Sequence, residues 1–189
     1  MKIRESGMPD ELYWESFFDV NNIFSKLELI PSVKDVVEFG SGYGTFTIPA
    51  SKIIEGNIYA FDIDNSMINR LKERSAKENI NNIKILQKDF VKDKTGLKDN
   101  SVDYIMLFNI LHAEDPISLL KESYRILKYK GKLAIIHWIY SEITPRGPSL
   151  NIRPKPEDCK QWMESAGFSL AKPVISLPPY HYGILGLKE

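Results

Sequence analysis

Short, mostly apolar runs recur along the chain, separated by longer segments in which apolar and polar residues alternate. Runs such as Val36–Phe39 and Val102–Phe108 are typical of strands that are buried on both faces of a parallel sheet. The predicted strands cover residues 36–39, 58–61, 83–87, 102–108, 132–139, 168–176 and 182–187.

Helical spacing of apolar residues appears between these runs. Pro116 follows Asp115, which predicts a helix start capped by the aspartate. Cys159, Trp162 and Met163 fall on one face of a later segment. The predicted helices cover residues 45–54, a segment capped by Asn65 or Ser66, residues 116–127 and residues 156–166. Strands that alternate with helices favour a doubly wound, Rossmann-like α/β sheet with helices on both faces.

A separate helical segment precedes the first strand. Residues 1–9 are expected to form an irregular arm, and Asp10 is expected to cap a helix over residues 11–18. A second short helix is predicted over residues 23–29.

Trp14, Phe17 and Phe18 lie on one face of the first predicted helix. These aromatic residues either cover one side of the core or close over a pocket, and the pattern leaves both interpretations open. We therefore divide the chain into an N-terminal helical lid, residues 1–30, and a main domain, residues 31–189, within one domain overall.

The stretch E-F-G-S-G-Y-G-T over residues 38–45 joins the first strand to a helix. Glycines allow the backbone to turn sharply and to approach a ligand closely, and a helix start offers unpaired N–H groups. A dinucleotide fingerprint would need glycine at position 45, where this chain has Thr45. The loop therefore predicts a nucleotide site and disfavours a nicotinamide dehydrogenase.

Acidic residues follow later strands of the predicted sheet. Asp62 comes at the end of the second strand, where a carboxylate can accept hydrogen bonds from ribose hydroxyls. Asp89 and Phe90 follow the third strand, and Asn109 follows the fourth. Because ligands bind at the carboxyl ends of the strands in this architecture, these residues are candidates for one site.

These motifs resemble those of the class I S-adenosylmethionine-dependent methyltransferases. E-x-G-x-G-x-G over residues 38–44 is similar to their motif I, Asp62 to their motif II acid, and residues 103–109 to their motif IV. Residues 126–133 are similar to the family's L-K-x-G-G element, with Lys130 in place of its middle glycine. The resemblance covers residues 34 to 189 and is nearest to the ubiquinone/menaquinone methyltransferase-like branch, also called methyltransferase type 11.

The resemblance implies a seven-stranded sheet in the order 3-2-1-4-5-7-6 with the last strand antiparallel. It also implies metal-independent transfer of a methyl group from S-adenosyl-L-methionine to a small-molecule acceptor by in-line displacement. The alternatives are a protein or peptide methyltransferase and a catalytically silent cofactor-binding subunit. The residues expected to bind the cofactor are Glu38, Gly40, Gly42, Gly44, Asp62, Ile63, Asp89, Phe90 and Asn109.

Candidate residues for catalysis and for the acceptor lie at the same edge of the predicted sheet. A general base is needed only if the acceptor carries a proton at neutral pH, and histidine is the commonest such base. A structural role is the more frequent one for an isolated histidine. The catalytic candidates are His112, Asn109 and His137, and the acceptor candidates are Trp14, Phe18, Tyr180 and His181.

Composition narrows the choice of partners. The chain has 25 basic and 25 acidic residues among 189, and this balance argues against a nucleic-acid binder, which usually carries a basic excess. The N-terminus has no apolar signal segment and no run is long enough to span a bilayer, so a cytoplasmic location is the default expectation.

Several methyltransferase classes lack their signatures here. No Asn-Pro-Pro-Tyr-like motif follows the fourth strand, and Leu177-Pro178-Pro179-Tyr180 is interpreted as a rigid turn. His137-Trp138 stands where metal-dependent catechol-type enzymes need an acid, so no metal is predicted. A lone cysteine, Cys159, is too few for an arsenic methyltransferase, and Glu114 alone is too few for an arginine methyltransferase.

Overall fold

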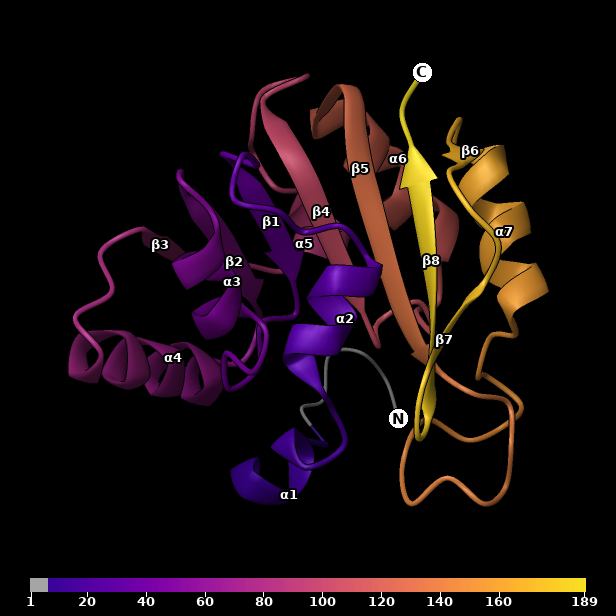
Figure 1. The fold of residues 1–189 in the computed structure, drawn as a ribbon, viewed down its shortest axis with the longest axis horizontal. Helices are drawn as coiled ribbons and strands as arrows, with labels where there is room; N and C mark the ends of the chain where they lie inside the picture. Colours follow the sequence, from indigo (N-terminus) through magenta and orange to yellow (C-terminus); the bar gives the residue numbers. More distant parts are fainter. Residues whose placement is uncertain (1–6) are drawn as a thin grey trace.

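The computed structural model describes residues 7–189, which form one sheet with helices on both faces (Figure 1). Within these residues the sheet has eight strands in the order β3-β2-β1-β4-β5-β8-β6, and β7 also pairs with β8. The strands are β1 Val36–Phe39, β2 Ile58–Asp62, β3 Ile83–Gln87, β4 Val102–Phe108, β5 Leu127–Trp138, β6 Ser169–Leu170, β7 Ile175–Leu177 and β8 His181–Leu187. Residues 1–6 of the predicted N-terminal arm lie outside the described part of the chain.

The strand directions agree with the predicted topology. Strands β1 to β5 pair in parallel, and β8 runs antiparallel to β5, β6 and β7. The strand predicted over residues 168–176 is divided into β6 and β7, which both pair with β8. Pro173 lies between them and has no N–H to give to a ladder, which accounts for the interruption.

Residues 128–131, between the predicted helix over residues 116–127 and the predicted strand over residues 132–139, lie inside β5. The register with β4 shifts between the pair Val102–Leu127 and the pair Tyr104–Lys132, so the intervening residues form an irregularity rather than a separate turn. Lys130 has a φ of 61°, in the left-handed region that favours glycine. This is the position at which the chain departs from the L-K-x-G-G element.

The core has two main layers, one on each face of the sheet (Figure 1). Along β4, Tyr104 and Met106 pack with α2 and α3, whereas Ile105 and Leu107 pack with α6 and α7. This two-sided burial explains why β4 is apolar at almost every position. The helices are α1 Glu11–Glu15, α2 Val20–Lys26, α3 Thr47–Ile53, α4 Asn65–Lys77, α5 Phe90–Asp93, α6 Pro116–Ile126 and α7 Pro156–Ser165.

Side-chain caps shift several helix boundaries from their predicted positions. Asp19 accepts a hydrogen bond from the Asn22 N–H and starts α2 before residue 23. Asp64, rather than Asn65 or Ser66, caps α4. Asp89 accepts from the Lys92 N–H and starts α5, a helix that none of the predicted elements covers. Helices α1 and α3 are shorter than predicted, spanning Glu11–Glu15 and Thr47–Ile53.

The carboxyl ends of β1, β2, β4 and β5 meet at one edge of the sheet, at the bottom of the view in Figure 1. Helix α1 and the long connection over residues 140–155 lie at this same edge. The fold therefore gathers the N-terminal segment, the glycine loop and this connection around one end of the parallel strands. None of the helices in residues 7–189 has the length and apolar character that a bilayer crossing requires.

Candidate active site

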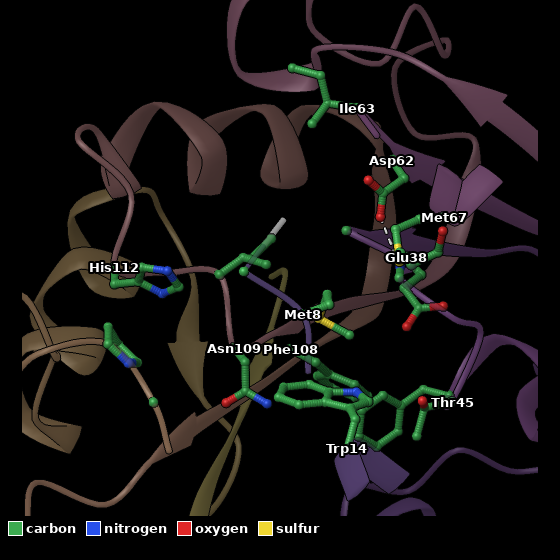
Figure 2. Close-up of a pocket in the computed structure, with 18 of the residues that line it drawn as sticks. Met8, Trp14, Glu38, Thr45, Asp62, Ile63, Met67, Phe108, Asn109 and His112 are labelled. Carbon is green, nitrogen blue, oxygen red and sulfur yellow. Dashed lines mark hydrogen bonds between the residues drawn. The ribbon is translucent and has the colours of Figure 1, made fainter. Parts of the chain in front are cut away.

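A pocket of about 430 Å³ lies at the carboxyl ends of the parallel strands. Figure 2 shows His112 on one side of it and Glu38 and Asp62 on the other. The residues that line it are Gly7, Met8, Trp14, Glu38, Gly40, Ser41, Gly42, Thr45, Phe46, Asp62, Ile63, Met67, Asp89, Phe90, Val91, Phe108, Asn109, Ile110, His112, Trp138, Arg146, Gly147 and Pro148.

The glycine loop is built from left-handed backbone conformations. Gly40, Gly42 and Gly44 have φ values of 75°, 53° and 84°, which ordinary side chains rarely adopt. Gly40 and Gly42 line the pocket, whereas Gly44 does not. A Cβ on Gly44 would lie 2.5 Å from Leu71 Cδ1, so this glycine lets the loop pack against α4. The structure thus places two of the predicted cofactor glycines at the pocket and the third beneath it.

Asp62 holds the glycine loop as well as facing the pocket. Its Oδ2 accepts a hydrogen bond of 2.8 Å from the Gly42 N–H, and its Oδ1 accepts one of 2.9 Å from the Asp64 N–H. Burial raises the pKa of the Asp62 carboxyl, and these backbone donors oppose the rise. Asp64 is directed to its own helix, where it accepts from the Ser66 N–H at 2.8 Å.

Glu38 is a buried acid at the end of β1. The Thr47 hydroxyl donates a hydrogen bond to its Oε2. Burial raises the pKa of the Glu38 carboxyl to about 8, and the nearby Asp62 adds to the rise while Thr47 opposes it. Without a ligand, this carboxyl is therefore mostly protonated at neutral pH.

The remaining predicted cofactor residues also line the pocket. Ile63 and Asp89 follow β2 and β3, and Phe90 packs edge-on against Phe39 with ring centroids 5.1 Å apart. Asn109 leaves β4 with a φ of 58° and is anchored by its N–H, which donates to the Ile136 carbonyl at 2.8 Å.

Three polar side chains of the pocket lack hydrogen-bond partners within residues 7–189. They are the hydroxyls of Ser41 and Thr45 and both amide atoms of Asn109, and all of these atoms are buried. Such groups are costly to bury unpaired, so they are available to a polar ligand. Sequence reasoning missed Ser41 and Thr45 as site residues. Their position within and directly after the glycine motif was the signal for them.

The predicted catalytic histidines form a pair, of which one reaches the pocket. His112 lines it, whereas His137 is fully buried behind His112 and is not among the lining residues. Nδ1 of His112 lies 3.4 Å from Nε2 of His137. Burial lowers the pKa of His112 to about 4 and that of His137 well below its usual value. Both rings are therefore neutral at pH 7.

Of the four residues predicted to contact the acceptor, only one lines the pocket. Trp14 lines the pocket, whereas Phe18, Tyr180 and His181 do not. Phe18 packs on Trp14 with ring centroids 5.0 Å apart and on His181 at 4.6 Å. These residues form an aromatic layer behind Trp14. Burial lowers the pKa of His181 to about 3. Sequence reasoning missed Trp138, which lines the pocket and packs on Trp14 at 6.3 Å.

None of the residues of α1 is fully buried, and ion pairs hold this helix in addition to the packing of Trp14. Arg70 of α4 pairs with Glu11 at 2.7 Å, and Arg74 pairs with Glu11 at 2.9 Å and with Glu15 at 2.7 Å. Arg74 also donates to the Tyr43 carbonyl in the glycine loop at 3.0 Å. We call this set of residues the α1 clasp.

The two interpretations of the N-terminal aromatic residues both have support in the structure. Phe17 follows α1 and is buried against Trp138, with ring centroids 5.4 Å apart. Trp14 meanwhile lines the pocket. The same short segment therefore contributes to the core and to the wall of the site.

The chain is similar to known proteins both in sequence and in structure. A family described as "Methyltransferase domain" matches residues 37–135, just over half of the chain. The crystal structure of an S-adenosylmethionine-dependent methyltransferase from Aquifex aeolicus is similar over 95% of this chain and 94% of that one, with a TM-score of 0.84 and 26% identity.

Curated relatives match a shorter part of the chain. The chain is 30% identical over 127 residues to ribosomal protein L11 methyltransferase of Streptococcus thermophilus, covering 64% of this chain and 36% of that protein. It is 25% identical over 114 residues to demethylmenaquinone methyltransferase of Listeria monocytogenes, covering 59% of this chain and 47% of that protein. The chain spans less than half the length of the curated relatives it matches.

Proposed function

The chain belongs to the class I S-adenosylmethionine-dependent methyltransferases, in their type 11 branch, and from this premise we propose that it transfers a methyl group to a small-molecule acceptor by in-line displacement, without a metal. The observation that carries the proposal is that one pocket joins the glycine loop, the strand-end acids and the neutral ring of His112. S-Adenosyl-L-methionine is the cofactor of this family, and it supplies the methyl group.

The residues of the pocket fit this cofactor. Gly40 and Gly42 leave the loop open to a ligand, and Ser41, Thr45 and Asn109 offer unpaired buried polar atoms. We assign the ribose hydroxyls to Asp62 and the adenine amine to Asp89, with Phe90 and Ile63 packing beside the base. The carboxyl of Glu38 lies deeper in the pocket and can compensate positive charge on the cofactor.

His112 is the candidate for accepting a proton from the acceptor. Its Nδ1 faces His137, which leaves Nε2 as the ring nitrogen available to the pocket. If His112 donates its Nδ1 hydrogen to His137, the lone pair of Nε2 is free to take a proton. His137 then acts as a positioning residue, because it is buried and selects the tautomer of its neighbour. Asn109 is assigned to ligand binding.

The segments that line the pocket support a small acceptor. Trp14 and Met8 of the N-terminal segment line it from one direction, and Gly147 and Pro148 of the 140–155 connection line it from another. A folded protein substrate would have to displace these segments. The similarity to ribosomal protein L11 methyltransferase favours protein methylation as the second candidate function.

Metal-independent chemistry is supported by the side chains present. Within residues 7–189, no group of three or more His, Cys, Asp or Glu residues comes together in a way that could hold a metal ion. The acids of the pocket are instead engaged with backbone and hydroxyl donors, as Asp62 and Glu38 show. Orientation of the reactants in such a site can contribute several orders of magnitude in rate.

Two measurements test the proposal. Calorimetric titration with S-adenosylmethionine, S-adenosylhomocysteine and NAD should show binding of the first two in preference to NAD. A methylation screen of metabolites and of peptides, with radiolabelled cofactor, should then show label on a small molecule. Equal or tighter binding of NAD would overturn the cofactor assignment. Label on peptides alone would favour the second function, and binding without any transfer would indicate a silent subunit.

A further inference from the structure

We infer that the acceptor is a planar organic anion and that Arg146 recognises its charge. The inference rests on the proposed function, since it names the chemical class of the acceptor in the same pocket. Arg146 comes from the connection after β5, whereas Glu38 and Asp62 lie at the carboxyl ends of β1 and β2 and Asp89 follows β3. In the sheet order, β4 stands between these strands and β5, so the cation and the acids reach the pocket from different sides.

The acidic side chains and the guanidinium of Arg146 therefore lie on different sides of the pocket. Among the lining residues that the structure describes, Arg146 is the one lysine or arginine. The acids on the β1–β3 side suit a cationic cofactor. On the β5 side a fixed guanidinium faces the same space, and a negative group on the acceptor compensates it. An uncharged or cationic acceptor would leave that guanidinium without a counterion.

Arg146 is available to a ligand because no acid in the described part of the chain neutralises its charge. Its Nη2 donates to the Gly7 carbonyl, and no carboxylate in residues 7–189 forms an ion pair with it. The contrast with Arg74 and Arg125 is clear, since both of these are paired with acids. A guanidinium has five N–H donors, so one hydrogen bond leaves most of them for a ligand.

A buried arginine, Arg153, holds the backbone around Arg146 in place. Arg153 donates to the hydroxyl of Thr144 and to the carbonyls of Ile139, Ser141, Arg146 and Pro148. Gly147 has a φ of 117°, and a Cβ there would lie 2.8 Å from Arg153 and 2.9 Å from Trp138. The connection is thus a preorganised wall of the pocket rather than a free loop, and it holds Arg146 in place.

The shape of this side of the pocket favours a planar molecule. The indole rings of Trp14 and Trp138 both line it, with ring centroids 6.3 Å apart and planes inclined by 58°. Aromatic walls give flat ligands contact area and offset or edge-on ring packing. A single guanidinium without neighbouring lysines matches the two oxygens of a carboxylate. The preferred acceptor therefore carries an aromatic or conjugated ring and a carboxylate-like group.

The test uses the full chain loaded with S-adenosylhomocysteine and titrated with 2-naphthoate, 2-naphthamide and decahydro-2-naphthoate, with binding followed by nuclear magnetic resonance. A charge-assisted contact predicts that 2-naphthoate binds at least about 10-fold more tightly than the neutral amide. The saturated, non-planar acid should bind more weakly than 2-naphthoate. Arg146→Gln should abolish the preference for the acid over the amide, and Arg146→Lys should retain part of it. Lys121→Gln, on the exposed face of α6, is the matched control and should retain all of it.

The outcomes separate this inference from the proposed function. Titration of S-adenosylhomocysteine into Arg146→Gln should give the wild-type affinity, and thermal unfolding should show that the variant is folded. Equal binding of the acid and the amide by the wild-type protein, or no binding of either, would overturn the inference while leaving the cofactor assignment intact. An equal loss of affinity for the acid and the amide in Arg146→Gln would also overturn the inference, because Arg146 would then act only through its hydrogen bond to Gly7. If S-adenosylhomocysteine itself does not bind, the proposed function fails, and the acid preference is measured on the free protein.

Discussion

Nδ1 of His112 and Nε2 of His137 lie 3.4 Å apart, at the end of the hydrogen-bonding range. His112 borders the pocket and His137 is fully buried, so the pair connects the reaction space to the interior of the sheet. Burial disfavours charge on both rings, and a charge on His112 adds to this effect at His137. The pair is therefore neutral when an acceptor binds.

Replacement of His112 tests its assignment as the base. His112→Gln should lower kcat for a proton-bearing acceptor by about 10²- to 10⁴-fold, with unchanged cofactor affinity, because only proton removal is lost. His137→Gln should lower kcat less and displace the pH profile. Since the pKa of His112 is about 4, the wild-type rate should hold from pH 7 to about pH 5 and fall near pH 4. Wild-type turnover in His112→Gln would exclude the role.

Asp62 and Asp64 provide a matched pair of acids. Asp62→Ala should weaken cofactor binding by about 1.5–3 kcal/mol, because it removes a charged acceptor from the ribose. It should also lower the melting temperature, since Gly42 and Asp64 lose their buried acceptor. Asp64→Ala should cost about 1 kcal/mol of stability through the lost cap of α4 and leave affinity unchanged. Calorimetry and thermal unfolding measure the two effects, and a reversed pattern of affinities would reverse the assignment.

Glu38 should release a proton when a cationic cofactor binds. Its pKa of about 8 in the free protein means that it is mostly neutral at pH 7, and a cation in the pocket favours the carboxylate. The binding enthalpy of S-adenosylmethionine at pH 7 should therefore depend on the ionisation enthalpy of the buffer. Glu38→Gln removes the titrating group and should reduce this dependence. Identical enthalpies in all buffers for the wild-type protein would contradict the prediction.

The same shift of Glu38 has a consequence for stability. The folded pKa lies above the unfolded value of 4.5, so the folded state binds more protons between pH 4.5 and about pH 8. The contribution of Glu38 to stability is present below pH 4.5 and declines as the pH rises through this interval. Cofactor binding should offset this decline by stabilising the carboxylate.

The α1 clasp should affect the acceptor more than the fold. Partly exposed ion pairs contribute about 1 kcal/mol or less each, so Glu11→Gln with Glu15→Gln should lower stability only slightly. The KM of the acceptor should rise, because Trp14 is no longer held against the pocket, and high salt should mimic the substitution in the wild-type protein. Lys52, paired with Glu78 away from the pocket, offers the control variant Lys52→Gln. A KM that depends on neither salt nor the two glutamates would contradict this role.

The sheet was predictable because its signals are local. The buried strands are apolar at nearly every position, and the topology then follows from their alternation with helices. Local patterns did not predict the ends of helices and strands that depend on side-chain contacts. Asp19 and Asp89 start helices through single hydrogen bonds, and Pro173 divides a strand that otherwise has an unbroken pattern.

The site was predictable where a motif specifies the backbone. Gly40, Gly42 and Asp62 meet at the pocket because a strand, a turn and a helix start must follow one another there. Trp138 could not be predicted in the same way. It meets the pocket where it packs beside Gly147, and no spacing in the sequence encodes that packing.

Arg74 joins Glu11 and Glu15 of α1 to the carbonyl of Tyr43 in the glycine loop, so a single side chain serves two segments. Any free energy by which an occupied glycine loop favours docked α1 must equal the free energy by which docked α1 favours an occupied loop. A cofactor that favours docked α1 is therefore itself bound more tightly by the docked form, by the same factor, and the wall against which the acceptor binds is most complete when the cofactor is present.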